Sequence, residues 1–337
     1  MKAQELDNSP NISAIERLKS LVGDELEKVD SVIWSQVKSH VDLIPEMSEH
    51  TISAGGKRLR PILTLASAGL CGYEGTSHID IAASVEFIHT ATLMHDDVVD
   101  GSKLRRGLLT ANNVWGNRES ILVGDFLLAK AFHLMGAAKS LDVYRILSNA
   151  AVVISEGEVL QLSAIDNIEN AESWYFSVVR AKTAELFAAA CEVSAILANK
   201  SVKERLALRE YGLNLGIAFQ IVDDALDYSA KQEKLGKNIG DDFREGKVTL
   251  PVIFAYRNGT DIQKEFWNNA VKSDNNSDED LALAIEYMTI NGVVNSSMEV
   301  AKQYIAKAYE SIDIFSDDSV YKKPLVDLLD YVIQREF

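Results

Sequence analysis

The distribution of proline is the strongest constraint on how this chain folds. The 337 residues include five prolines, and none lies between Pro61 and Pro251. Because proline removes a backbone donor and clashes with the preceding turn, a long stretch without it permits long helices. Residues 180–200 are rich in Ala, Leu and Glu and lack β-branched alternation, which is typical of a helix. We therefore predict an all-α protein.

One stretch is expected to form a central helix. Residues 79–97 are apolar around most of the helix circumference, which predicts burial, with a start near Ser77 and a stop near Gly101. The polar run 272–287 is expected to be a loop that offers an N-cap to the next helix. Because no linker or short repeat divides the chain, we predict one helical domain over residues 1–337, with residues 1–12 as a candidate flexible segment.

Composition excludes several classes of function. The chain is 47% hydrophobic and 25% charged, as expected of a soluble globular protein, and its net charge of −16 opposes a role as a nucleic-acid binder. The first residues lack the apolar core of a signal peptide, and no uninterrupted apolar run approaches the roughly 18 to 20 residues of a membrane span. Cys71 and Cys191 lack metal-ligand spacing, which favours a reducing compartment without disulfides.

Two acidic clusters follow apolar helical stretches, in "LMHDDVVD" and "FQIVDDALDY". Residues four apart on a helix share one face, so two such faces across a cavity would form an oxygen cage for hard divalent cations. Mg²⁺ fits best, because it shares its coordination sites between carboxylates, waters and substrate phosphates. A solvated helix end could explain either motif alone, but two copies after apolar helices favour a metal site. The carboxylates are Asp96, Asp97, Asp100, Asp223, Asp224 and Asp227.

Two dense basic segments supply candidate anion sites. "GGKRLRP" contains Lys57 and Arg60, and "GSKLRRG" contains Arg105 and Arg106 directly after the first acidic motif. Arginine forks and lysine point charges suit diphosphate oxygens. Surface charge that offsets an acidic protein is the alternative. Taken with the acidic motifs, these segments specify a helical cavity that holds two diphosphates.

The order of these motifs resembles that of a known family. "GGKRLRP", "EFIHTATLMHDDVVDGSKLRRG", "VGDFLLAKAF", "EGEVLQL", "AKTAELF", "FQIVDDALDY" and "LGKNIGDDFREGKVTLP" follow one another as in trans-isoprenyl diphosphate synthases, the polyprenyl synthetase family. Within the family, the chain is most similar to bacterial enzymes that make octaprenyl diphosphate for respiratory quinones. The resemblance implies an isoprenoid-synthase-type helical bundle around a deep central cavity, in a homodimer, with the two aspartate-rich helices facing one another.

The resemblance also implies a role for each matched residue. The six aspartates would hold several Mg²⁺ ions, and the implied catalytic groups are Asp96, Asp97, Asp100, Lys182, Asp223 and Asp224. The groups that would hold the allylic diphosphate are Arg105, Lys182, Lys237 and Lys247. Isopentenyl diphosphate would be bound by Lys57, Arg60, His89 and Arg106. Thr183 and Gln220 would line the reacting centre.

Without the resemblance, several of these residues have simpler explanations. His89 alone would be a core histidine, Gln220 a partner for a buried backbone group, and Thr183 a helix residue that bonds to its own backbone. Lys182 and Lys237 would face solvent. The family context favours the functional roles.

The implied reaction is a prenyl transfer in the cytoplasm. An allylic diphosphate, which we expect to be farnesyl diphosphate, would ionise, and isopentenyl diphosphate would attack the carbocation in successive rounds. No protein base is compelling for the final proton loss, so the released diphosphate is the expected acceptor. The chain needs no transmembrane segment, although release of a long apolar product could involve transient membrane contact.

Product length depends on the helical turn before the first acidic motif. Ala91 and Thr92 precede Asp96 by about one turn, where a growing tail would pass, and both are small. Because an aromatic side chain there would close the tunnel, we predict a long product. Close helix packing is the alternative reason for Ala91. Phe132 and Met135 are candidates for the tunnel floor.

Three other functions remain open from the sequence: a shorter-chain synthase, a class I terpene cyclase and a noncatalytic subunit of a heteromeric synthase. A cyclase usually carries a different second metal motif, whereas this chain repeats DDxxD. A noncatalytic subunit usually lacks key aspartates or cations, which are all present here. Both observations favour chain elongation.

Overall fold

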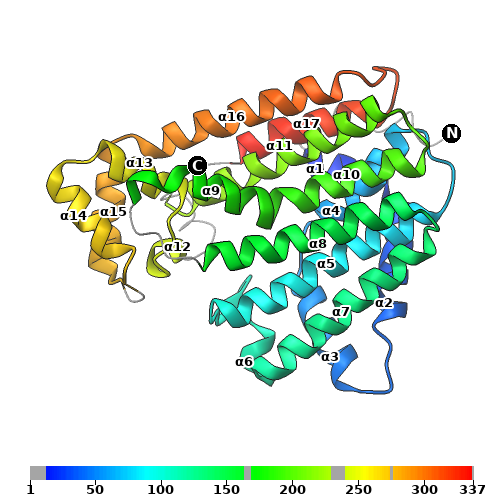
Figure 1. Cartoon of the computed structure of the whole chain (residues 1–337), viewed down its shortest axis with the longest axis horizontal. Coiled ribbons are helices and arrows are strands. Elements are labelled where there is room, and N and C mark those ends of the chain that lie inside the picture. Colours follow the sequence, from blue (N-terminus) through cyan, green and yellow to red (C-terminus); the bar gives the residue numbers. More distant parts are fainter. Residues whose placement is uncertain (1–12, 163–167, 229–239, 274–275, 336–337) are drawn as a thin grey trace. The chain divides into compact units, whose positions relative to one another are not determined.

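The computed structural model describes residues 13–162, 168–228, 240–273 and 276–335 as a helical protein (Figure 1). The chain forms two compact units. Unit 1 contains Met1–Val152, Leu186–Arg209 and Ile312–Asp327, and unit 2 contains Val153–Glu185, Glu210–Ser311 and Leu328–Phe337. The predicted all-α fold is confirmed, whereas the single domain and the central cavity stay predictions.

The elements divide between the units as follows. Unit 1 contains α1 (Ala14–Leu21), α2 (Gly23–Gln36), α3 (Leu43–Ser53), α4 (Leu59–Leu70), α5 (Ser77–Val99), β1 (Leu104–Arg105), β2 (Leu108–Leu109), α6 (Ala111–Trp115) and α7 (Asn117–Ala137). Unit 2 contains η1 (Ile168–Asn170), α9 (Ala171–Val179), η2 (Arg180–Ala184), α12 (Asp241–Arg244), α13 (Leu250–Asn258), α14 (Asp261–Ala270) and α15 (Asp278–Ile290). Helices with residues in both units are α8 (Leu141–Gln161), α10 (Glu185–Leu197), α11 (Val202–Leu226), α16 (Val293–Ile312) and α17 (Lys322–Gln334).

Helix α5 is the central helix of unit 1, as its sequence predicted. It packs against α2, α4 and α7, and its apolar side chains, such as Phe87 and Ile88, are fully buried (Figure 1). Two buried hydroxyl groups tie α5 to α7: Ser84 donates to the backbone oxygen of Ala131, and Ser120 donates to that of Met94. These bonds satisfy polar groups in an otherwise apolar interface.

The end of α5 is sharply defined. Gly101 has a φ of 62°, and its N–H donates to the oxygen of Val98 while that of Ser102 donates to Asp97. This is the Schellman arrangement, in which a left-handed glycine closes the last turn. The predicted stop near Gly101 is therefore confirmed. Ser77 is the first helical residue, and Thr76 occupies the cap position without a side-chain bond.

A short antiparallel hairpin follows α5 and contains Arg105 and Arg106 of the second basic segment. Leu104 pairs with Leu109 and Arg105 with Leu108. The two linking residues, Arg106 and Gly107, both have positive φ, at 53° and 81°. Two-residue hairpins favour this conformation because its twist matches that of the strands. The hairpin thus fixes the direction of the basic side chains after the first acidic motif.

Two predicted boundaries in unit 2 differ from the structure. The expected helix over 180–200 begins with a π-helical turn, η2, before α10. The expected loop over 272–287 ends at Ser277, which caps α15 through a reciprocal capping box with Asp280. The prediction of a cap was correct, but the loop is shorter because the residues after Ser277 already belong to the helix.

Helix α7 is the one described helix that is long and apolar enough to cross a membrane by length and composition. Asp125 and Lys130 lie within α7, so its apolar sequence is interrupted. A core helix of a globular protein meets the same criterion, and α7 buries Val123, Leu127 and Ala131 along α5.

Both cysteines are free and buried in unit 1. Burial raises the pKa of each thiol, at Cys71 and at Cys191, to about 12. A thiol with so high a pKa is a poor nucleophile at neutral pH. The prediction for residues 1–12 lies outside the described residues.

Candidate active site

The first acidic motif closes helix α5 in unit 1. Asp96 and Asp97 are buried, and Asp100 is the exposed residue that caps the helix. The N–H of Asp100 donates to the oxygen of Asp96 at 2.8 Å, so the helical register continues and these two carboxylates lie one turn apart. The spacing therefore has the local geometry that the sequence predicted.

Arg105 from the hairpin pairs with this motif. Its Nε and Nη2 both donate to Oδ1 of Asp97, at 3.0 and 2.8 Å. Asp97 is almost fully buried, and a buried carboxylate is costly unless it is paired and hydrogen-bonded. The guanidinium also has N–H groups that Asp97 does not use. Arg105 therefore anchors the acidic motif and can offer donors to an anion.

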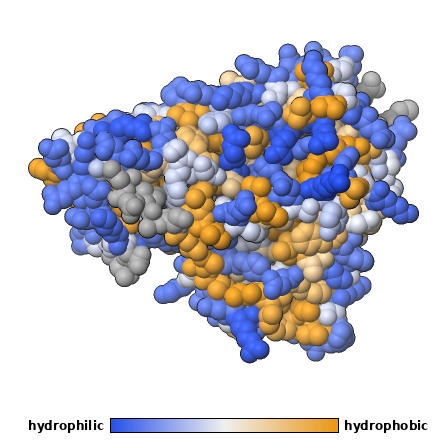
Figure 2. Space-filling view, in the orientation of Figure 1, coloured by the Kyte–Doolittle hydropathy of each residue, from blue (hydrophilic) through white to orange (hydrophobic). Residues whose placement is uncertain are grey.

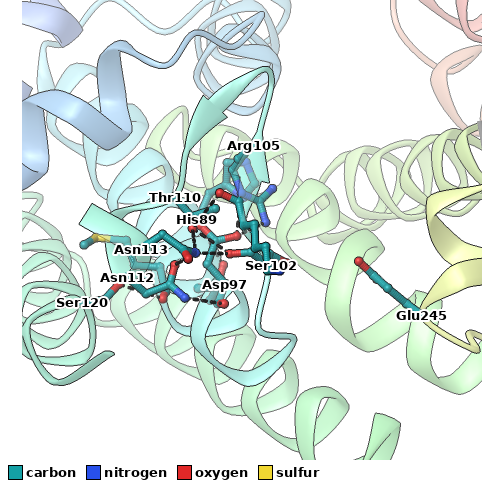
Figure 3. A network of polar contacts seen from close by, with 12 residues as sticks. His89, Asp97, Ser102, Arg105, Thr110, Asn112, Asn113, Ser120 and Glu245 are labelled. Atoms are coloured by element: carbon teal, nitrogen blue, oxygen red, sulfur yellow. Dashed lines mark hydrogen bonds and ion pairs between the residues drawn. The ribbon is translucent and has the colours of Figure 1, made fainter. Parts of the chain in front are cut away.

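Polar residues of α6 and the segment before it hold the intervening loop in place (Figure 3). Asn112 donates to the backbone oxygen of Asp97 at 3.0 Å, Thr110 to that of Ser102 at 2.7 Å, and Asn113 to that of Ser102 at 2.7 Å. These bonds satisfy backbone groups left open by the turn. The loop that carries the basic residues is thus fixed to the end of α5.

The two basic segments come together in unit 1. A Cβ atom on Gly56 would lie 2.9 Å from Nη1 of Arg106, so the absence of a side chain there leaves room for the guanidinium. Arg58 donates to Glu86 on α5 and has a left-handed φ of 52°. The sequence-predicted anion sites are therefore neighbours, although they are separated by almost fifty residues.

Arg60 and His89 belong to the same basic cluster. The guanidinium of Arg60 lies 4.5 Å from the centre of the Phe187 ring, and its buried Nε has no hydrogen-bond partner. Burial lowers the pKa of Arg60 to about 10, with Glu86 opposing that shift and Arg106 adding to it. A buried cationic donor without a partner is the kind of group that an anionic ligand satisfies.

His89 stays neutral in this cluster. Burial, followed by the positive charges of Arg60, Arg105 and Arg106, holds the pKa of His89 well below its usual value. A neutral imidazole donates one hydrogen bond without adding charge. His89 can therefore orient an anion, whereas the arginines supply the attraction.

The second acidic motif lies at the end of α11 in unit 2, where it meets neutral donors. Tyr175 of α9 donates to Oδ2 of Asp224 at 2.5 Å, and Gln220 donates to Oδ1 at 2.8 Å. Thr183 in turn donates to the amide oxygen of Gln220 at 2.8 Å. The two residues predicted to line the reacting centre thus belong to one hydrogen-bond network around Asp224.

A further carboxylate, Asp242 at the start of α12, belongs to this group. Its backbone N–H donates to Oδ2 of Asp227 at 3.0 Å, and Lys247 lies 3.5 Å from its Oδ1. Burial, and then the charge of Asp242, raises the pKa of Asp224 to about 8 and that of Asp227 to about 7. Such crowding of carboxylates is relieved when a cation binds among them.

Lys182 and Thr183 lie in the π-helical turn η2. The N–H of Glu185 donates to the oxygen of Arg180, five residues back, which widens this turn. Turns of this kind are frequent at functional sites. A Cβ on Gly157 would lie 2.7 Å from Cβ of Ala181, so the glycine of "EGEVLQL" lets α8 approach η2 closely. The ammonium of Lys182 then donates to Glu158 at 2.8 Å and to Gln161 at 3.2 Å.

The remaining predicted residues have the following places. Lys57 is exposed between α3 and α4. Lys247 contacts Glu245 at 2.5 Å as well as Asp242. Ala91 is buried in α5, and the hydroxyl of half-buried Thr92 donates to the backbone oxygen of His89 at 2.8 Å. Lys237 lies outside the described residues. Phe132 is half-buried and Met135 fully buried in α7.

Sequence reasoning missed several partners of the predicted residues. Tyr175, Asp242 and Glu158 each contact a predicted site residue, and Glu86 pairs with Arg58. Asp242 and Glu158 stand inside quoted motifs, so their charge was a usable signal. The sequence around Tyr175 gave no such signal, because nothing local to α9 indicates that its partner is Asp224, 49 positions away.

The chemistry of these donors suits a hard divalent cation shared with a ligand. Carboxylate oxygens are the ligands that such cations prefer. Among the residues that the structure describes, no three His, Cys, Asp or Glu side chains are grouped as ligands of one metal ion. A Mg²⁺ ion bound here would therefore complete its coordination with water and phosphate oxygens, as it commonly does.

The comparisons with known proteins identify the family. Residues 41–288 match the family described as polyprenyl synthetase. The chain belongs to the polyprenyl synthetase family. It is 41% identical over 322 residues to the octaprenyl diphosphate synthase of Escherichia coli, covering 96% of this chain and 99% of that one. It is 39% identical to the geranyl-diphosphate-specific all-trans-nonaprenyl-diphosphate synthase of Rhodobacter capsulatus, covering 93% and 96%.

Solved structures support the same assignment. A polyprenyl synthase from Caulobacter crescentus, crystallised with calcium and isoprenyl diphosphate, superposes with a TM-score of 0.91 at 44% identity, covering 96% of this chain and 98% of that one. Polyprenyl synthetases use divalent metal ions, and the curated relatives are prenyl diphosphate synthases. This chain is accordingly a prenyltransferase of that class, which confirms the predicted family and enzyme class.

Proposed function

We propose that this polyprenyl synthetase is a Mg²⁺-dependent enzyme that adds isopentenyl diphosphate repeatedly to farnesyl diphosphate and ends at octaprenyl diphosphate, for quinone side chains. The observation that carries the proposal is the pairing, in each unit, of an aspartate-rich helix end with basic side chains. In unit 1, Asp97 is held by Arg105 beside the cluster of Arg60, His89 and Arg106. In unit 2, Arg335 lies 2.6 Å from Asp223, and Lys247 lies 3.5 Å from Asp242, whose backbone N–H donates to Asp227.

In the proposed reaction, the basic residues bind the diphosphate groups of the two substrates. Arg105, Lys182 and Lys247 bind the allylic diphosphate, together with Lys237 outside the described residues. Their positive charge stabilises the negative charge that develops on the leaving group. Lys57, Arg60 and Arg106 bind the diphosphate of isopentenyl diphosphate, and neutral His89 orients it through one N–H bond.

The six aspartates of the two motifs would hold the metal. Bound Mg²⁺ would neutralise diphosphate charge and so favour departure of the leaving group. Gln220 keeps the carboxylate of Asp224 in one orientation, because its amide donates to that group while accepting from Thr183. Tyr175 adds a second neutral donor.

A long product is supported by the size of residues in the turn before the first motif. Ala91 is buried and Thr92 is half-buried with its hydroxyl turned to the backbone of its own helix. Neither side chain is large enough to close a path along this face of α5. The octaprenyl assignment additionally follows the Escherichia coli relative.

The direct test incubates purified protein with Mg²⁺, farnesyl diphosphate and labelled isopentenyl diphosphate, and resolves products by chain length. We expect a ladder that ends near octaprenyl diphosphate and disappears on chelation. A ladder that ends at geranylgeranyl diphosphate would instead identify a shorter-chain synthase. No incorporation by folded protein would favour a noncatalytic subunit, and a cyclic hydrocarbon would favour a terpene cyclase.

A homodimer is proposed through an apolar surface of unit 1 formed by α7 and the first part of α8. Ile121, Leu122, Leu141, Tyr144 and Val152 are all exposed there. Figure 2 shows apolar residues gathered over these helices. Contiguous apolar surface of this kind marks interaction sites. Light scattering should therefore give the mass of two chains, and Leu122→Lys should shift the protein towards one, with Val202→Lys, exposed on α11, as control.

The proposed compartment is the cytoplasm, which agrees with two buried thiols that are not joined in a disulfide. Because the product is long and apolar, we propose that its release uses transient contact with a membrane. Lipid vesicles should then raise the steady-state rate without changing the rate of a single turnover. Equal stimulation of both rates would contradict a role in release.

A further inference from the structure

An arginine at the end of α17 contacts the second acidic motif. Nη1 of Arg335 lies 2.6 Å from Oδ1 of Asp223, and its guanidinium carbon lies 4.7 Å from the centre of the Phe219 ring. Phe219 and Asp223 are one turn apart on α11, so they present adjacent contacts to the same guanidinium. All three residues belong to unit 2.

The contact is more than a chance meeting of exposed charges. The side chain of Arg335 is 18% exposed, against 37% for Asp223. The backbone N–H of Arg335 donates to the oxygen of Tyr331 at 3.0 Å, which fixes the residue to the last turn of α17. A ring on one side and a carboxylate on the other hold a cation better than either would alone.

The interaction between Arg335 and Asp223 is mainly electrostatic. Nη1 of Arg335 has no hydrogen-bond partner, although it lies close to the carboxylate. The guanidinium therefore acts on Asp223 mainly through its charge. This differs from Arg105, whose two N–H groups point at Asp97. A charge contact without directed bonds is the easier of the two to exchange for another cation.

The other carboxylates of the motif have different partners. Asp224 accepts bonds from Tyr175 and Gln220, and Asp227 accepts one from a backbone N–H. Asp223 forms an ion pair with Arg335. Position 335 thus supplies a positive charge at the carboxylate where the proposed function requires a divalent cation.

We propose that Arg335 is a built-in counter-ion of Asp223 that competes with the divalent cation and is displaced when the metal binds. This rests on the proposed function, because it takes Asp223 as a metal ligand. A divalent ion about 2.1 Å from the same oxygen would lie within about 5 Å of Nη1, where like charges repel. Arg335 therefore weakens metal binding before substrate arrives and balances the charge of Asp223 in the metal-free protein.

The test measures metal binding rather than catalysis. Free Mn²⁺ is followed by electron paramagnetic resonance as it is titrated into the full-length protein without diphosphate. Arg335→Gln should tighten apparent Mn²⁺ binding by about three- to tenfold, because the competing charge is gone. Arg335→Lys, which keeps the charge, should remain close to the wild type.

Arg257→Gln is the matched control. Arg257 also pairs with a carboxylate, Glu172, and lies 5.7 Å from the Phe254 ring in unit 2, and neither partner belongs to the motif. Its substitution should leave Mn²⁺ binding unchanged. Phe219→Leu is the second test variant, because it loosens the guanidinium without removing charge and should tighten binding by about twofold.

The outcomes separate this inference from the proposed function. Unchanged or weaker Mn²⁺ binding in folded Arg335→Gln would overturn the inference, and so would equal tightening in Arg257→Gln. If Arg335→Gln does not fold, unchanged binding in Phe219→Leu overturns it. Asp223→Ala tests the proposed function separately: it should weaken binding, and if it does not, Asp223 is no metal ligand.

Discussion

The two DDxxD motifs have the same residues at the same spacing but different electrostatic surroundings. The first, at the end of α5, lies beside a cationic cluster in which Arg105 grips Asp97 and His89 is kept neutral. The second, at the end of α11, meets neutral donors, a further carboxylate, Asp242, and one guanidinium, that of Arg335. Burial, and then the charge of Asp242, raises the pKa of Asp224. A motif therefore specifies donor type, whereas the neighbours that the fold supplies decide how strongly the donors attract a cation.

The two motifs also differ in the size of a side chain one helical turn before the first aspartate. Alanine stands five residues before the first aspartate in both motifs, at Ala91 and at Ala218. At the next position, however, the first motif has Thr92 and the second has Phe219, which stacks on Arg335. The side chain at this position is therefore smaller in the first motif than in the second, which the proposed path of a growing chain along α5 requires.

The largest expected effect comes from removing one carboxylate of either motif. Asp97→Ala and Asp224→Ala should each lower kcat/KM by at least about 100-fold, since each removes a proposed metal ligand that would assist departure of the leaving group. Steady-state incorporation of labelled isopentenyl diphosphate measures the loss. Asp142→Ala, in an exposed pair with Arg145, is the control and should keep activity. Retained activity in one motif variant would show that only the other motif matters.

A change of product length should follow only at the first motif. Thr92→Phe and Ala91→Phe place a ring beneath the proposed diphosphate site and should shorten the products. Ala91 is buried, so its variant should also lose about 1–3 kcal/mol of stability through overpacking. Chromatography of the products tests this prediction, with Phe219→Leu as the matched change at the second motif. A shift in the Phe219→Leu products would contradict the assignment of the tail path.

Removing a neutral hydrogen-bond donor from the second motif should lower activity moderately. Tyr175→Phe removes the hydroxyl that donates to Asp224 and should lower kcat/KM by about tenfold, the size expected for a hydrogen bond to a charged group. Tyr287→Phe, which keeps the ring of Tyr287 against Phe266 and lies outside the candidate site, is the control. If Tyr175→Phe keeps full activity, Gln220 alone is sufficient to orient Asp224.

The smallest expected effect is a pH dependence of stability in the cationic cluster. The folded protein holds the pKa of His89 well below its usual value. Below about pH 6.5, His89 is therefore protonated in the unfolded chain but neutral in the folded protein. The free energy of unfolding should therefore fall as pH falls, by up to about 1 kcal/mol over one pH unit. Urea titrations at about pH 7.5 and about pH 5.5 should show a larger loss in wild type than in His89→Gln. An equal loss would place the sensitivity elsewhere.

The sequence by itself determined the helices, the end of α5 and the residue types of both motifs. These depend on local features: the absence of proline, apolar burial and a left-handed glycine at position 101. Motif order also indicated the family, because such a series of segments is specific.

Tertiary structure alone decided which side chains contact the site residues. Tyr175 reaches Asp224 across 49 positions, Arg335 reaches Asp223 from α17, and a close approach at Gly157 brings α8 to the π-helical turn of Lys182. Such contacts bring together segments far apart in the chain, and no local pattern encodes them. The physical reason is that burial and charge at a site are properties of all the elements packed around it, so the pKa values and ion pairs follow only once the chain is folded.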